Sequence, residues 1–146
     1  MRVLMITMAV PVIGLALAAA PASAAPAAAS PYHAALSASE ENPTTGPAGG
    51  TGTARVTIDA AAGHLCYDLT WSPQVGAPSA AHIHKGAAGT SGPIVVILNE
   101  PPSPKACVMA AGPVLQGIAA DPSGYYVNIH SNAYPGGAVR GQLQAG

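Results

Sequence analysis

Three histidines in two short segments are the residues of this chain whose types and spacing best suit chemistry. His82 and His84 lie in the motif AHIHKG, and His130 ends the motif YVNIH. Each segment is predicted to be a β-strand, in which side chains alternate between two faces. His82 and His84 then share one face while Ile83 points to the other, and Asn128 shares a face with His130. If the isoleucine faces form the core, the three imidazoles project from the far side of one sheet.

A face of this kind has three interpretations. Imidazole suits copper and zinc, and an HxH pair with a third histidine from a neighbouring strand supplies three ligands and leaves an open position. The metal ligands would be His82, His84 and His130. The rings can instead bond backbone carbonyls and fix the glycine-rich loops that follow both motifs, or the face can contact a protein or a glycan. Asn128 and Arg140, predicted on the same outward face, are candidate contacts for a ligand or an anion.

Signatures of other active sites do not appear in the sequence. There is no G-x-S-x-G and no H-E-x-x-H motif. Glu40 and Glu41 are adjacent, so on a strand they would face opposite ways and could not act as a carboxylate pair. Asp68 is expected to be a solvated strand residue or a partner that orients a histidine. His33 and His64 are expected to be surface residues, with a fourth metal ligand as the alternative. We therefore expect no catalytic residues, and no enzyme activity unless the histidines bind a metal.

The N-terminus has the layout of a secretory signal peptide over residues 1–24. Arg2 precedes an apolar run that ends at the small-x-small sequence Ala-Ser-Ala, residues 22–24. An uncleaved anchor is the alternative, because the run approaches the roughly 20 residues that cross a bilayer. Residues 25–31 (APAAASP) are predicted to be a flexible linker. These features predict a secreted, extracellular protein with no membrane span after signal cleavage.

Charge and cysteine content narrow the class of protein further. Charged residues make up 8% of the chain and the formal net charge is −1, which argues against nucleic acid as a partner because phosphates require a basic surface. The two cysteines, Cys66 and Cys107, are expected to form a disulfide in an oxidising compartment. Its loop of about 40 residues would stabilise the fold by about 4 kcal/mol. A metal site that uses both cysteines is the alternative, although no CxxC spacing occurs.

The spacing of turn residues predicts an all-β fold. Proline and glycine recur about every eight to twelve residues with short β-rich runs between them, which indicates a sandwich or a barrel. The apolar run Ile94–Leu98 is predicted to be a strand buried on both sides, and residues 115–120 are predicted to form one helical turn. The other predicted strands are residues 32–38, 52–59, 64–71, the AHIHKG segment, 125–130 and, after a loop at 134–137, 138–144.

The succession of motifs resembles the CHRD domain, a module first described in the developmental protein chordin and widespread in secreted bacterial proteins. The resemblance rests on AHIHKG, GPIVVxL, GYYVNIH and PGGxVRGQL in this order, and places the domain at residues 32–144. Two positions depart from the family pattern. Ala138 stands where the family usually has Glu, and the early E-V-P-P element is weakened to ENPT at residues 41–44. The resemblance implies an extracellular, antiparallel β-sandwich of immunoglobulin-like or superoxide-dismutase-like Greek-key architecture.

Two functions from different classes follow. The first is a non-enzymatic extracellular binding or structural module that contacts an extracellular protein or a cell-envelope partner. The second is an exported copper- or zinc-binding protein that uses the three histidines. A strand HxH pair followed by a later VxIH strand also occurs in copper/zinc superoxide dismutases, so a superoxide-handling role belongs to the second hypothesis. The sequence does not identify a partner, a substrate, an oligomeric state or the metal.

Overall fold

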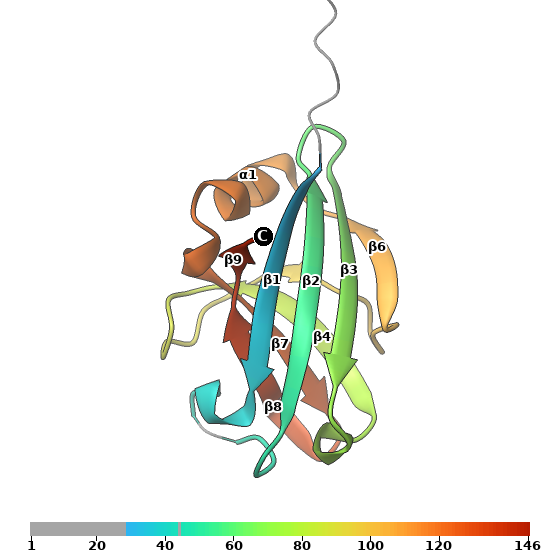
Figure 1. Cartoon of the computed structure of the whole chain (residues 1–146), viewed down its shortest axis with the longest axis vertical. Coiled ribbons are helices and arrows are strands. Elements are labelled where there is room, and N and C mark those ends of the chain that lie inside the picture. Colours follow the sequence, from blue (N-terminus) through green and yellow to red (C-terminus); the bar gives the residue numbers. More distant parts are fainter. Residues whose placement is uncertain (1–28, 44) are drawn as a thin grey trace, which may run out of the picture.

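A computed structural model describes residues 29–43 and 45–146, which form nine strands, one α-helix and three short 3-10 helices (Figure 1). The predicted signal peptide and most of the predicted linker lie outside these residues. The first strand begins at Ser30, inside the predicted linker. The strands are β1 (Ser30–Ser37), β2 (Thr51–Asp59), β3 (His64–Trp71), β4 (Pro78–Lys85), β5 (Ile94–Ile97), β6 (Lys105–Met109), β7 (Tyr125–Ser131), β8 (Tyr134–Gln142) and β9 (Gln144–Ala145). The helices are η1 (Ala38–Glu40), η2 (Pro73–Val75), α1 (Gly112–Ala120) and η3 (Pro122–Gly124).

The strands form one antiparallel sheet in the order β5-β4-β7-β8-β1-β2-β3-β6, with β9 paired to β1. The sheet folds over on itself where β8 meets β1, which are paired only at Ser37 and Arg140. Figure 1 shows β1, β2 and β3 in front of β4, β7 and β8. The all-β prediction is confirmed, and the sheet has the form of a sandwich that nearly closes into a barrel.

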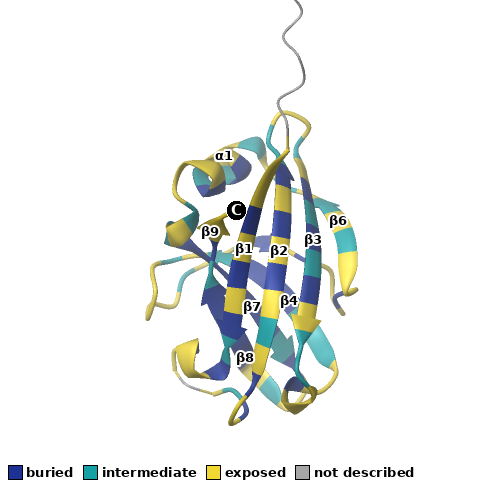
Figure 2. Ribbon diagram, in the orientation of Figure 1, coloured by how far each residue is buried: buried dark blue, intermediate teal, exposed yellow. Residues whose placement is uncertain are grey.

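Alternation along the strands explains why these residues form two layers. In β2, Ala54, Val56 and Ile58 are buried, while the residues between them are exposed. The same pattern runs through β1 and β3, as the alternating colours of Figure 2 show. A period of two is the signature of a strand with one face on the core and one face in solvent. The inward face of this half of the sheet therefore forms one wall of the core.

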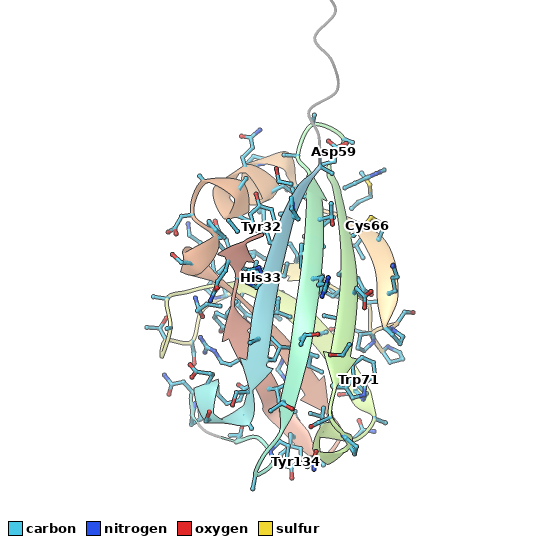
Figure 3. The ribbon with its side chains drawn as sticks, in the orientation of Figure 1. Tyr32, His33, Asp59, Cys66, Trp71 and Tyr134 are labelled. Carbon is cyan, nitrogen blue, oxygen red and sulfur yellow. A yellow bond between two sulfur atoms is a disulfide. The ribbon has the colours of Figure 1, made fainter. Side chains whose placement is uncertain are left out.

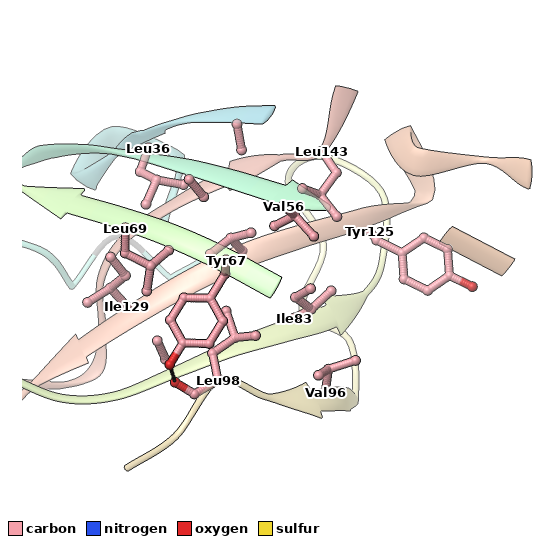
Figure 4. Close-up of a cluster of buried hydrophobic side chains, with 14 of the residues drawn as sticks. Leu36, Val56, Tyr67, Leu69, Ile83, Val96, Leu98, Tyr125, Ile129 and Leu143 are labelled. Atoms are coloured by element: carbon pink, nitrogen blue, oxygen red, sulfur yellow. Dashed lines mark hydrogen bonds between the residues drawn. The ribbon is translucent and has the colours of Figure 1, made fainter. Parts of the chain in front are cut away.

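The core is built from aliphatic side chains that meet between the two layers. Val56 and Leu69 come from one layer, and Ile83 and Ile129 from the other (Figure 4). All four are 2% exposed or less. Tyr67 adds a polar contact at the edge of this core, because its hydroxyl donates to the carbonyl of Leu98 at 2.7 Å. The burial of Ile83 and Ile129 fixes which face of β4 and β7 is left for the histidines.

Three parts of the structure differ from the sequence-based expectations. The prediction that Ile94–Leu98 is buried on both sides was wrong: β5 is an edge strand, with Ile94 and Ile97 49% and 54% exposed. Val96 and the following Leu98 are buried in the core, and Val95 is partly buried against it. The predicted single turn at 115–120 is the end of a longer helix, α1. The predicted loop at 134–137 belongs to β8, since β7 and β8 already pair at Ser131 and Tyr134.

Candidate metal site

The three histidines lie on the face of β4 and β7 that points away from the core. Ile83, between His82 and His84, is fully buried, and so is Ile129 before His130. This alternation is the one that the sequence predicts. Among the described residues, His82, His84 and His130 form the group whose side chains could hold a metal ion, and their ligand atoms lie within 4.8 Å of one another. We call these three residues the histidine cluster.

The rings of the cluster gather around His82. Its ring centroid lies 5.6 Å from that of His84 and 5.0 Å from that of His130. The planes are inclined to each other by 72° and 58°, so the rings are not stacked. Inclined rings can direct one nitrogen each toward a common point, whereas parallel stacked rings cannot.

Backbone carbonyls determine the tautomers of two of the rings. Nδ1 of His84 lies 2.8 Å from the carbonyl oxygen of Gly92, and Nδ1 of His130 lies 3.0 Å from that of Pro135. A carbonyl only accepts, so Nδ1 must carry the proton in both rings. In the neutral rings, Nε2 of each residue therefore presents its lone pair. Both Nε2 atoms are buried and make no hydrogen bond to any described residue.

A carboxylate holds the ring of His82 through Nε2, whereas the other two rings are held through Nδ1. Nε2 of His82 lies 2.8 Å from Oε1 of Glu100, which accepts the Nε2 proton. The lone pair of His82 is then on Nδ1, which is also buried and unpartnered within the described chain. Each ring thus uses one nitrogen for a protein acceptor and leaves the other one free. Metal-binding histidines have this arrangement, because the second nitrogen is held by a carboxylate or a carbonyl that orients the ring.

Burial keeps two of the rings neutral. Burial lowers the pKa of His84, and the nearby charges of His82 and Arg140 lower it further, while the bond to Gly92 opposes the shift. Burial also lowers the pKa of His130, with the bond to Pro135 as the main opposing contribution. A metal ion binds the neutral imidazole. Both rings are therefore in the ligand form at neutral pH.

Comparison with known protein families places the cluster in context. The family model described as the CHRD domain matches residues 32–143, which include all three histidines and nearly all of the described fold. The chain belongs to the CHRD domain family. Comparisons with curated proteins and with solved structures gave no match. The resemblance seen in the sequence is confirmed, and the chemistry of this CHRD domain has to be argued from its own residues.

The two predicted contacts for a ligand or an anion, Asn128 and Arg140, are both buried in the CHRD domain. Arg140 donates to the carbonyl of Thr90 at 2.9 Å and lies 3.5 Å above the ring centroid of Tyr126. The same tyrosine stacks in parallel on His84, with centroids 4.8 Å apart, and its hydroxyl accepts from the N–H of Gly92 at 3.1 Å. Arg140 therefore fixes the loop above the site and the stack beside it, and its contact with an anion stays a prediction.

Asn128 is hydrogen-bonded to a buried acid that lies near the N-terminal end of the domain sequence. Its Nδ2 donates to Oε1 of Glu41 at 2.6 Å. Glu41 is 5% exposed, and burial raises its pKa to about 7, although Arg140 and Asn128 both act to lower it. In the sequence, Glu41 is marked only by its neighbour Glu40, with which it cannot act as a carboxylate pair, and by its place at the start of the ENPT element. The structure gives it a separate role, because Glu41 alone turns inward over the histidine face.

Sequence reasoning missed Tyr126 and Glu100. Tyr126 could have been found, since it shares the alternation that puts Asn128 and His130 on one face. Glu100 could not, because it lies in the irregular NEPPSP segment and reaches His82 through the fold. No alternation or motif marks that loop as part of the site.

The remaining candidates lie outside the cluster. His33 and His64 are exposed on β1 and β3, and Figure 3 labels His33 on β1 in the front layer. Asp68 forms an exposed ion pair with Lys105, with Oδ2 and Nζ 3.6 Å apart, as expected for a solvated strand residue. Cys66 and Cys107 form the predicted disulfide, which removes them as metal ligands. Within residues 29–43 and 45–146, no helix is long and apolar enough to cross a membrane.

Proposed function

We propose that this CHRD domain binds a copper or zinc ion through His82 Nδ1, His84 Nε2 and His130 Nε2. The observation that carries the proposal is that three buried imidazole nitrogens lie together without a hydrogen bond to any described residue, while the other nitrogen of each ring is held by an acceptor. Three neutral nitrogen ligands suit these two metals and leave at least one coordination position for another ligand.

The alternative is that the histidines only hold loops in place. That role explains the hydrogen bond made by one nitrogen of each ring, but not the burial of the other nitrogen. His84 and His130 do fix backbone carbonyls through Nδ1. A histidine that only pins a loop has no reason to bury its second nitrogen unpaired, because a buried polar atom without a partner costs about 1–3 kcal/mol. Three such atoms side by side favour a bound cation.

The test is a calorimetric titration of the purified protein, carrying no histidine tag, with Cu(II) and with Zn(II). We expect one ion to bind per chain. The variant His82→Ala/His84→Ala/His130→Ala should bind none. The matched control is His33→Ala/His64→Ala, which removes the exposed histidines and should bind as the wild type does. Equal binding by the triple variant, or no binding by a folded wild type, would overturn the proposal.

Glu100 provides a second, graded test. Its carboxylate holds the Nε2 proton of His82 and makes Nδ1 a better donor. Loss of such a partner lowers metal affinity by roughly 10- to 100-fold in known sites. We expect Glu100→Ala to weaken binding by about this amount. Glu100→Gln, which keeps an oxygen acceptor without its charge, should lie between Glu100→Ala and the wild type. Wild-type affinity in Glu100→Ala would show that His82 does not bind the ion.

Other parts of the function stay predictions. The Cys66–Cys107 disulfide is consistent with an oxidising compartment, and hence with secretion. A superoxide-handling role depends on copper as the bound ion, because zinc does not change oxidation state. The non-enzymatic binding module remains the alternative if the titration shows no metal, and the Greek-key relation to immunoglobulin or superoxide dismutase sandwiches also stays a prediction.

A further inference from the structure

One buried polar atom beside the histidine cluster has no role in the metal site described above. Asn128 is 3% exposed, and its Oδ1 makes no hydrogen bond to the described residues. Buried acceptors are normally paired, since leaving one unpaired is costly. The position of Oδ1 therefore points to a partner outside the described residues.

Asn128 borders all three members of the cluster. It is the direct partner of His82 across β4 and β7, which makes it a diagonal neighbour of His84. His130 follows two residues later on the same face of β7. Direct partners have Cβ atoms about 4.5–5.5 Å apart and diagonal ones about 7–8 Å. The amide thus lies at the edge of the space that the ion would occupy.

The contacts of Glu41 set the direction of the Asn128 amide. Glu41 accepts from Asn128 Nδ2. It packs on Gly137 of β8, where any side chain would collide with its carboxylate, and the charge of Arg140 on the same strand acts on it. Strand β8 flanks β7 on the side opposite to β4. Because Nδ2 turns toward β8, Oδ1 on the other arm of the amide faces β4, where His82 and His84 lie.

We propose that Asn128 is a positioning residue whose Oδ1 accepts a hydrogen bond from the ligand that completes the coordination of the ion. This inference rests on the proposed function. A lone acceptor selects a ligand that carries a proton, such as water, hydroxide or a hydroperoxide, over an anion that only accepts. An amide oxygen suits hard cations such as Mg²⁺ or Ca²⁺, whereas three imidazoles suit copper or zinc. Asn128 therefore acts on the ligand and is not itself a fourth ligand of the ion.

The test is an azide titration of the Cu(II)-loaded protein, followed by its charge-transfer absorption. Azide only accepts, and it must displace the water that Oδ1 holds. In Asn128→Leu the water loses this acceptor, so we expect the Kd for azide to fall by about three- to tenfold, the effect of one hydrogen bond. Copper stoichiometry should not change, and copper affinity should fall by no more than the same three- to tenfold.

Glu41→Gln gives a second variant that keeps Asn128. A glutamine at position 41 both donates and accepts, so the Asn128 amide can turn and present Nδ2 to the ligand, and azide should again bind more tightly. The matched control is Ser131→Ala, which removes another buried oxygen that has no partner in the described part of the chain, on the other face of β7. Its azide affinity should equal that of the wild type.

The outcomes separate this inference from the proposed function. Tighter azide binding in both variants, with no change in the Ser131→Ala control, supports the role of Asn128. Unchanged azide affinity in both, with copper bound, overturns that role and leaves the metal site intact. A large loss of copper affinity in folded Asn128→Leu overturns it too, since Asn128 would then be a ligand of the metal. A folded wild type that binds no copper overturns both proposals.

Discussion

Copper affinity of the histidine cluster is expected to stay nearly constant from pH 8 to 6.5 and then to fall by several orders of magnitude toward pH 5. Protons compete with the metal for each imidazole, so affinity falls by up to about tenfold per ligand for each pH unit below the pKa of that ligand. An ordinary histidine has a pKa near 6.5. Burial lowers the pKa of His84 and His130. Their competition with the metal therefore begins below pH 6.5.

Competition titrations with a chelator of known affinity at pH 8, 7, 6 and 5 measure this profile. An affinity that is unchanged at pH 5 would show that imidazole is not the donor. A fall that already begins above pH 6.5 would show that burial does not lower the pKa values of His84 and His130. The Glu100→Ala variant supplies the comparison, because it should lower affinity without removing the low-pH fall due to His84 and His130.

The fold should survive in this pH range because the buried groups act in opposite directions. The lowered pKa values of His84 and His130 contribute stability that is present above pH 6.5 and is lost as pH falls through their folded values. The pKa of Glu41 is raised from 4.5 to about 7. Its contribution is present below pH 4.5 and is lost as pH rises through 7. Circular dichroism at each pH separates loss of metal from loss of fold.

The arrangement of the cluster could be predicted from sequence because it depends on a local rule. A period of two in β4 and β7 puts His82, His84 and His130 on one face wherever Ile83 and Ile129 are buried. What holds each ring cannot be predicted in this way. Glu100, Gly92 and Pro135 all lie in loops or at a strand start, and their positions follow from the packing of the whole sheet.

The strands of the fold show the same difference between features set by local alternation and features set by long-range packing. Strands with an interior partner on each side, such as β2, were predicted with nearly correct bounds because their alternation is complete. β5 was misread, since a run of Ile and Val has no polar residue to reveal its exposed face. Its place at the edge of the sheet follows from long-range pairing, because the next strand in the chain, β6, pairs with β3. A long-range choice of this kind leaves no periodic mark in the sequence.

Removal of the disulfide is expected to lower the free energy of unfolding by about 4 kcal/mol, the largest stability effect that we predict. Cys66 and Cys107 are direct partners across β3 and β6 and are separated by 41 residues, and the entropy of the unfolded chain rises when a loop of this length is opened. Strand β6 pairs with β3 alone, so the bond also holds an edge strand. Urea unfolding of Cys66→Ala/Cys107→Ala against the wild type measures the loss.

The control for this variant is another outward cross-strand pair on the same half of the sheet. Thr53 and Thr70 share a hydrogen bond between hydroxyls at 2.7 Å, and Thr53→Ala/Thr70→Ala should cost on the order of 1 kcal/mol or less. A similar loss from both double variants would mean that the covalent loop contributes nothing beyond a surface contact.

The folded cysteine variant should still bind one metal ion, because His82, His84 and His130 lie on β4 and β7, two strands that do not pair with β3 or β6. Stability and metal binding are thus separable, and a cysteine variant that folds but binds no metal would contradict the assignment of the site to the histidine face.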